Sequence, residues 1–146
     1  MTQISRIPLP KSLEAQMFTL FRTVLADLHS EADIADLLDD LLSPTEKVML
    51  GKRLAIAFLL DQGYDQRTIH TIMKVSVTTV NGVNYWLTHK GKGYRKAIGM
   101  VRTAQKWQGF MEKLDQTLRD IFSEKAMRQR VYGGLSAEQK PREIKL

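Results

Sequence analysis

The sequence contains no cysteine, only four prolines and few aromatic residues, and it has no long hydrophobic run. Without cysteine, the chain can form neither a disulfide nor a reactive thiolate. The longest uncharged apolar run, residues 54–60, has seven residues, whereas a membrane-spanning helix needs roughly 20. The N-terminal stretch MTQISRIPLP also lacks the apolar segment of a secretion signal. We therefore expect a cytoplasmic protein that makes no contact with a membrane.

The sequence also has little that supports catalysis or metal binding. Its three histidines, His29, His70 and His89, are not spaced as a ligand pair, and no glycine-rich phosphate loop precedes a predicted helix. The acidic residues between positions 33 and 40 follow helical spacing without a ligand-rich loop, which favours a solvated helix face over a metal site. We expect no enzyme activity, no metal and no cofactor.

The overall composition is that of one helical domain. A chain of 146 residues with 43% hydrophobic and 26% charged residues is close to the globular average and can bury one core. No stretch alternates apolar and polar residues for long enough to predict a strand. The predicted fold class is therefore all-α.

The charges are distributed unevenly along the chain. Residues 1–46 carry three basic and eight acidic residues, a net charge of −5, whereas residues 47–146 carry a net charge of +11. Between residues 63 and 96 there are six basic residues and a single acidic one, Asp65. A basic segment of this kind attracts a polyanion such as nucleic acid, although a solvated basic surface would show the same pattern.

Apolar residues recur at helical spacing in two N-terminal segments. The first predicted helix runs from Lys11 to Leu28. The second begins after Ser30, whose side chain is placed to cap it, and we expect its apolar residues to face inward. These residues are Ile34, Leu37, Leu38, Leu41 and Leu42.

A third helix has the clearest start signal in the sequence. The stretch Ser43-Pro44-Thr45-Glu46 combines a hydroxyl cap, a proline at the first helical position and a glutamate three residues after the cap. Residues 54–60 are apolar on all sides of this helix, which is typical of a helix packed between others. Gly63 is placed to end it.

Residues 65–87 have the pattern of a helix-turn-helix unit. Asp65 and Ser76 can cap two short helices, and Lys74-Val75 forms a tight turn between them. Lys74 stands where such units prefer glycine, so we expect a positive φ or an altered turn there. His70 also departs from the pattern, which prefers a small residue at that position. The apolar residues that would lock the two helices together are Ile69, Met73, Val75, Val80 and Val83.

The outward face of the second motif helix suits the major groove of DNA. Its first residues are small, and an asparagine one turn later has an amide that can pair with adenine. Lys90-Gly91-Lys92-Gly93 is expected to be a flexible basic corner that meets phosphates, although a solvated surface would show the same residues. The residues predicted to contact DNA are Gln66, Arg67, Lys74, Ser76, Val77, Thr78, Thr79, Asn81, Lys90 and Lys92.

The stretch LLDDLLSPTEKVMLGKRLAIAFLLDQG, followed by the helix-turn-helix segment, resembles the Trp repressor superfamily, including its branch of uncharacterised regulators. The specific features are the Ser/Thr-Pro-x-Glu start and the Leu-Gly-x-Arg step, and the resemblance covers roughly Lys11 to Ile98. It implies an intertwined, all-helical homodimer that binds palindromic operators in double-stranded DNA. It also implies that Arg67 approaches a base.

The resemblance is weaker at the ligand site of that family. Tryptophan-responsive members hold the indole between two arginines, of which Arg53 matches the first, whereas Gly82 stands at the second and has no side chain. We therefore expect that tryptophan is not the effector, and the sequence identifies no other small-molecule effector. Ser43 and Arg53 are expected to be remnants of a ligand site. Trp86 or Tyr85 is expected to fill the space.

The C-terminal third predicts one long helix. Apolar residues from Ala97 to Ile121 step by three and four, which is the seam of a helix that packs on another, either within the dimer or from a further partner. Phe110 and Phe122 widen the stripe, so we expect this helix to dock on the domain itself. Gly99 and Gly109 are candidate bends. The sequence thus divides into a helix-turn-helix domain (11–98), a helical extension (99–131) and a mobile tail (132–146). Basic residues of this third either extend the DNA footprint or form ordinary helix surface: Arg102, Lys106, Lys113, Arg119, Lys125, Arg128 and Arg130.

These features together predict a homodimeric, sequence-specific DNA-binding regulator, a repressor that does not respond to tryptophan. Phosphate contacts would supply affinity and the second motif helix would supply specificity. Two alternatives remain open on the sequence. The chain is either a helical protein-protein interaction module that no longer reads DNA, or the DNA-binding subunit of a mobile element.

Overall fold

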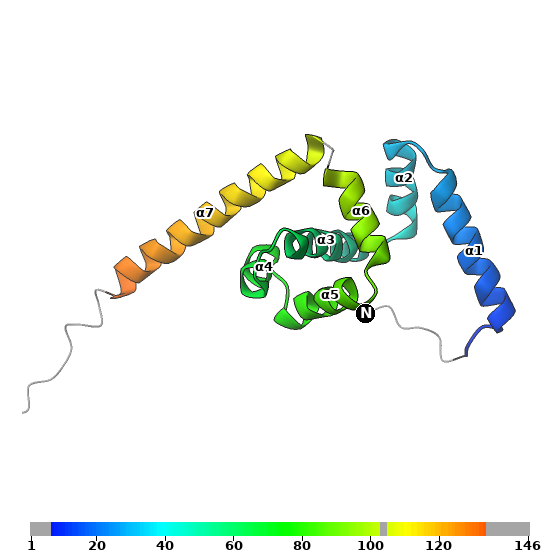
Figure 1. Ribbon diagram of the computed structural model, residues 1–146, viewed down its shortest axis with the longest axis horizontal. Coiled ribbons are helices and arrows are strands. Elements are labelled where there is room, and N and C mark those ends of the chain that lie inside the picture. Colours follow the sequence, from blue (N-terminus) through cyan, green and yellow to red (C-terminus); the bar gives the residue numbers. More distant parts are fainter. Residues whose placement is uncertain (1–6, 103–104, 134–146) are drawn as a thin grey trace, which may run out of the picture. The chain divides into compact units, whose positions relative to one another are not determined.

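The structure is a computed structural model that describes residues 7–102 and 105–133. Every regular element in these ranges is a helix, as the sequence predicts, and none is a strand (Figure 1). The helices are α1 (Lys11–Asp27), α2 (Glu31–Leu41), α3 (Pro44–Asp61), α4 (Gln66–Met73), α5 (Val77–His89), α6 (Lys92–Arg102) and α7 (Gln105–Gly133). The chain divides into two compact units, Met1–Gly51 and Lys52–Leu146. No helix in the described ranges is long and apolar enough to cross a membrane.

The helices of the N-terminal unit begin where their capping residues predict. The side chain of Ser30 accepts a hydrogen bond of 3.2 Å from the backbone N–H of Asp33 at the start of α2. At the start of α3, the Glu46 carboxylate accepts a hydrogen bond from the backbone N–H of Ser43 at 2.8 Å, and Ser43 Oγ accepts one from the Glu46 N–H at 3.3 Å. This reciprocal pair is a complete capping box.

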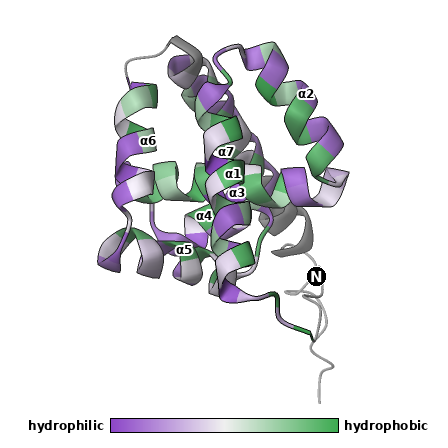
Figure 2. Cartoon of the chain, turned by 90° about the vertical axis from the view of Figure 1, so that its right-hand side faces the viewer, coloured by the Kyte–Doolittle hydropathy of each residue, from purple (hydrophilic) through white to green (hydrophobic). Residues whose placement is uncertain are grey.

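The apolar side of the N-terminal unit is not buried in the single chain. No residue of α1 or α2 is buried. Leu41, which was expected to face inward, is 50% exposed, and the ribbon of α2 alternates hydrophobic and hydrophilic positions (Figure 2). Between 39% and 66% of each large apolar residue on α1 is exposed, namely Leu13, Met17, Phe18, Leu20, Phe21, Val24 and Leu25. Two amphipathic helices therefore present apolar faces that this chain does not bury.

The second half of α3 supplies one wall of the main core. Residues 56–59 are buried, but Leu54 is 41% exposed, so the prediction of a helix covered on all sides holds only for its central turn. Gly63 ends α3 with a φ of 87°, a conformation that glycine adopts without strain. The backbone N–H of Tyr64 then reaches Leu59 O at 3.1 Å, and that of Gly63 reaches Leu60 O at 3.0 Å. This Schellman motif turns the chain toward α4.

The helix-turn-helix unit is locked by the residues that the sequence predicts. Ile69 from α4 and Val80 from α5 are both fully buried, and Val83 is 5% exposed. Met73 and Val75 are partly buried against the same cluster. Because these side chains hold one face of each helix, Arg67 on α4 and Thr78 and Asn81 on α5 remain exposed.

The prediction of one long C-terminal helix starting at Ala97 is wrong in its first part. The chain forms α6 up to Arg102, and α7 begins separately at Gln105. The core of α6 is also not on the predicted seam, because its buried residue is Ile98 while Met100 is 70% exposed. Of the predicted mobile tail, residues 134–146 lie outside the described ranges, and Gly133 is still helical.

The prediction that the C-terminal helix docks on the domain is confirmed by α7. Leu114 is 6% exposed and belongs to the same buried cluster as Ile69 and Val80. The ring of Trp107 lies 5.0 Å from that of Phe58 in an edge-on arrangement, centroid to centroid. Figure 1 shows α7 extending past α4. The helix thus forms part of the same core that supports the helix-turn-helix unit.

Candidate nucleic-acid interface

The N-terminal end of α5 is built from small polar side chains. The side chain of Ser76 accepts a hydrogen bond of 3.1 Å from the Thr79 backbone N–H, which caps the helix, and the two hydroxyls lie 2.8 Å apart. Thr78 and Asn81 are exposed, and Val77 is 41% exposed. Thr79 is only half-buried and lines a pocket on the inner side. The helix end therefore offers Val77, Thr78 and Asn81 to a partner.

These exposed residues lie on the side of α5 away from its core contacts. Val80 and Val83 face the interior, with 0% and 5% exposure. If Thr78 or Asn81 had occupied the interior, the motif could not have reached base edges. The structure instead leaves both side chains open to solvent.

The first motif helix is positioned by a strong N-cap. Asp65 Oδ1 accepts hydrogen bonds of 3.0 Å from the backbone N–H groups of Arg67 and Thr68. The Thr68 hydroxyl donates to the other carboxylate oxygen. Arg67 is exposed and Gln66 is half-buried on the same first turn. The cap fixes the start of α4, and with it the direction in which Arg67 leaves the helix.

These hydrogen bonds make the capping interaction dependent on pH. The bond from the Thr68 hydroxyl, followed by the backbone N–H groups, holds the pKa of Asp65 below its ordinary value of 3.8. Because the folded pKa is the lower one, the carboxylate stabilises the fold above the ordinary pKa, and this contribution is lost as the pH falls through the folded pKa. Asp65→Asn keeps an oxygen for the cap and removes the titration.

We expect the free energy of unfolding of the wild type to fall more steeply than that of Asp65→Asn as the pH drops from about 5 to about 3. Urea titrations followed by circular dichroism at several pH values measure both proteins. Parallel curves over this range would contradict the assignment of the cap.

The turn between α4 and α5 has the backbone conformation that the sequence predicts. Lys74 has a φ of 52° and is the one described non-glycine residue with a positive φ. The backbone N–H of Lys74 donates to His70 O, and the ring nitrogen Nδ1 of His70 is hydrogen-bonded to Val75 O. Lys52 Nζ donates to the carbonyl of Lys74 at 3.4 Å. The two residues that depart from the motif pattern therefore both take part in the turn.

The basic corner after α5 is tight, whereas the sequence predicted a flexible one. Only Lys90 and Gly91 separate α5 from α6, and Lys92 already belongs to α6. Gly91 is buried. The Arg95 guanidinium donates to Leu87 O at 2.9 Å and to Lys90 O at 3.3 Å. The two carbonyls at the end of α5 are thus held by a side chain from α6, and Lys90 and Lys92 lie on either side of this tight corner.

Lys52 and Arg95 were not among the functional residues predicted from the sequence. Both bind main-chain carbonyls rather than another side chain, so their role depends on the path of the chain and not on a motif. Arg95 does stand in the first turn of α6, where a long cationic side chain can reach back to the preceding helix end. For Lys52 the sequence has no comparable signal.

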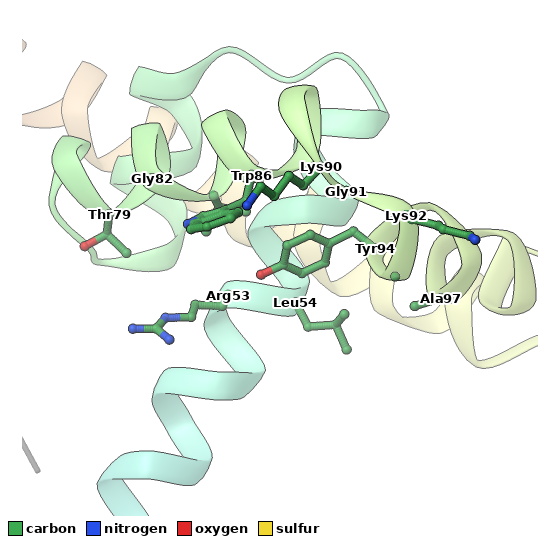
Figure 3. A pocket seen from close by; sticks show the side chains of 12 residues that line it. Arg53, Leu54, Thr79, Gly82, Trp86, Lys90, Gly91, Lys92, Tyr94 and Ala97 are labelled. Carbon is green, nitrogen blue, oxygen red and sulfur yellow. The ribbon is translucent and has the colours of Figure 1, made fainter. Parts of the chain in front are cut away.

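A pocket of about 960 Å³ lies between α3, α5 and α6. Trp86 from α5 and Tyr94 from α6 extend their rings into it, toward the part of α3 that carries Arg53 (Figure 3). Gly82 leaves one wall of the pocket without a side chain, and Lys90 Nζ lies 5.1 Å from the centre of the Trp86 ring.

The expectation that Trp86 or Tyr85 fills this space is not met. Trp86 lines the pocket, is 50% exposed and leaves it open. Tyr85 is not part of the lining, because its ring stacks on His89 at a centroid distance of 4.3 Å. Ser43, expected as a further remnant of a ligand site, belongs to the N-terminal unit, where it caps α3.

Two further features concern Arg102 and metal binding. Arg102, one of the basic residues considered for a DNA footprint, forms an ion pair with Asp61. Within the described ranges, no group of three or more histidine, cysteine or acidic residues is placed to hold a metal ion.

The helix-turn-helix unit lies within a segment that matches a known family. The family model described as Trp repressor protein matches residues 16–102, which is more than half of the 146 residues. No curated protein and no solved structure matched the chain. The matched segment begins in α1 and ends with α6, so it includes both motif helices and Arg53. The chain therefore belongs to the Trp repressor family.

Proposed function

We propose that this protein is a sequence-specific transcriptional repressor that binds duplex DNA as a homodimer. Its family suggests a helix-turn-helix DNA-binding regulator. The observation that carries the proposal is the two-sided build of α5, with Val80 and Val83 in the core and Thr78 and Asn81 exposed. A helix of this build can enter the major groove without disturbing the core.

Base recognition is assigned to the N-terminal half of α5. The amide of Asn81 can make two hydrogen bonds to an adenine edge, while methyl groups of Val77 and Thr78 meet thymine methyls. Ser76 and Thr79 already bond to each other at 2.8 Å, so their role is to fix the helix end, and Ser76 reaches DNA through its backbone. Arg67, with Gln66 beside it, approaches the DNA from α4.

Phosphate binding is assigned to the exposed lysines at the two ends of α5. Lys74 precedes the helix, and Lys90 and Lys92 follow it, so the cations flank the residues that read bases. Lys74 lies in the turn, and Lys92 follows the tight corner at the buried Gly91. Such contacts supply affinity that depends steeply on salt, because each one releases counterions from the DNA.

The homodimer is assigned to the apolar faces of α1 and α2. Seven large apolar residues of α1 are at least 39% exposed in the single chain. A second copy would cover them, and an intertwined pairing would place two α5 helices on one duplex. A twofold protein of this kind selects a palindromic site.

Selection from random duplexes with the purified full-length protein tests this function. We expect an enriched palindrome and a sharp fall of affinity with salt. Asn81→Ala should weaken binding to the selected duplex by about tenfold. The matched control is Asn84→Ala, one turn farther from the helix start, which should bind like the wild type.

The alternatives predict different outcomes of the same selection. A helical interaction module would enrich no motif and would instead retain a stable protein partner in a pull-down. The DNA-binding subunit of a mobile element would prefer inverted-repeat ends. Either result would contradict the proposed repressor.

The pocket between α3, α5 and α6 predicts that tryptophan is not the effector. Arg53 provides one cation for a ligand, but Gly82 provides no side chain on the facing wall of α5. An indole would therefore have the guanidinium of Arg53 on one side and none from α5 on the other. We expect calorimetry to detect no tryptophan binding at 1 mM, a concentration at which a site with roughly −4 kcal/mol would be half filled. Tight binding that is lost in Arg53→Ala would refute this prediction.

A further inference from the structure

The surface between α4 and α7 contains a second, smaller pocket that the helix-turn-helix assignment leaves unexplained. Its volume is about 160 Å³. Arg67, Thr68 and Thr71 line it from α4, and it is closed from α7 by Leu118, Ile121, Phe122 and Lys125. The family match ends at residue 102, so α7 lies outside the matched segment. One wall of this pocket therefore belongs to the motif and the other to the extension.

The α7 wall changes character where it passes the start of α4. Leu114 is buried, and Leu118 and Ile121 are half-buried, at the spacing of an apolar seam. The same spacing continues to position 125, where the sequence has a lysine in place of an apolar residue. The presence of Lys125 in the pocket lining shows that it faces α4.

Two cations thus share one small pocket. Arg67 and Lys125 are both exposed, and neither side chain forms an ion pair among the residues that the structure describes. No carboxylate lines the pocket in this part of the chain. The nearby Asp65 carboxylate is occupied by the cap of α4. Like charges repel in such a place unless an anion lies between them.

The two threonine hydroxyls of this pocket already donate hydrogen bonds within the chain, so only the cations are left to donate to a bound anion. Thr71 Oγ1 donates to Arg67 O at 3.0 Å, and the Thr68 hydroxyl donates to Asp65. An anion in the pocket would therefore be bound by the Arg67 guanidinium and the Lys125 ammonium. A guanidinium and an ammonium together are typical of phosphate recognition.

We propose that α7 extends the DNA-binding surface, and that Lys125 and Arg67 together hold a backbone phosphate beside the bases read by α5. The inference rests on the proposed function, because it takes the partner to be duplex DNA. It adds that the C-terminal extension is part of the interface. Lys125 contributes affinity and not sequence preference, since it meets only the backbone.

The test compares Lys125→Gln with Lys113→Gln in the full-length protein. Lys113 is an exposed lysine on the same helix that does not line the pocket, so it is the matched control. The probes are the selected duplex and a 40-bp duplex of arbitrary sequence. Losing one phosphate contact makes the salt dependence of log K shallower by about 0.9, or roughly eightfold weaker binding at 0.1 M salt. We expect this for Lys125→Gln on both probes, while Lys113→Gln and Lys125→Arg bind like the wild type.

The outcomes separate this inference from the proposed function. If the wild type binds DNA but Lys125→Gln and Lys113→Gln are equal, α7 is not part of the interface and the repressor assignment stands. If the wild type binds neither probe, both this inference and the proposed function are wrong.

A direct contact can be tested by cross-linking from an introduced cysteine, because the natural sequence contains none. Lys125→Cys carrying a photoreactive group should cross-link to the duplex, and Lys113→Cys should not. Equal cross-linking at both positions would contradict a local site at Lys125.

Discussion

Replacing Ile69 by alanine will lower the free energy of unfolding by about 3 kcal/mol. Ile69 is fully buried and belongs to the cluster that includes Val80 from α5 and Leu114 from α7. The substitution removes three carbon atoms from the place where α4, α5 and α7 meet. Because packed interiors relax only in part, a cavity remains and adds to the lost transfer free energy.

Urea unfolding followed by circular dichroism measures this loss, and Val77→Ala is the control. Val77 is also a β-branched apolar residue of the motif, but it is 41% exposed on the face of α5 assigned to DNA. Its replacement should change the free energy of unfolding by less than about 0.5 kcal/mol. We expect the two variants to separate stability from recognition, with Val77→Ala weakening DNA binding of a fully folded protein. Equal stabilities would show that Ile69 does not lock the motif.

The local elements of the motif could be predicted because each depends on neighbouring residues. The caps at Asp65 and Ser76 bond to backbone N–H groups two or three residues away, so the sequence alone contains both partners. The positive φ of Lys74 follows from the short turn in the same way. The exposure of Thr78 and Asn81 followed from the helical period, once the buried positions of the motif were recognised.

The C-terminal third shows why periodicity was not sufficient. A seam of apolar residues reports which positions can pack, but it does not report whether the helix is continuous. The same spacing extends through α6, but the buried residue there is Ile98, and Met100 on the predicted seam is exposed. On α7 the seam was correct and continued further than the apolar residues, to Lys125.

The open pocket beside Arg53 could not be foreseen from the residue types around it. Two large aromatic residues, Tyr85 and Trp86, suggested that the space was filled. The direction in which each ring leaves α5 explains the difference: Tyr85 turns to His89, while the Trp86 ring extends into the pocket without filling it. A substitution series at Gly82 would therefore act on an existing cavity, since a Cβ there meets nothing within 4 Å.

Gly91→Ala will lower the free energy of unfolding by about 2 kcal/mol, although this residue lies in a corner that its composition suggested was flexible. A Cβ at this position would lie 2.8 Å from Leu87 Cα and closer still to Leu87 O. Both are backbone atoms of α5, and the Leu87 carbonyl is also held by Arg95 at 2.9 Å. The clash cannot be relieved by turning a side chain, so α5 and α6 must move apart.

Gly93→Ala is the matched control, two residues later in the same corner. A Cβ there meets nothing within 4 Å, and the residue lies in the first turn of α6, so alanine should stabilise the protein by about 0.5 kcal/mol. Chemical unfolding measures both variants, and opposite signs are expected. If the corner were flexible, the two substitutions would have the same small effect, and Lys90 and Lys92 would lose their fixed positions. The measurement therefore tests whether the lysines after α5 that we propose to bind phosphate are held in place by the fold.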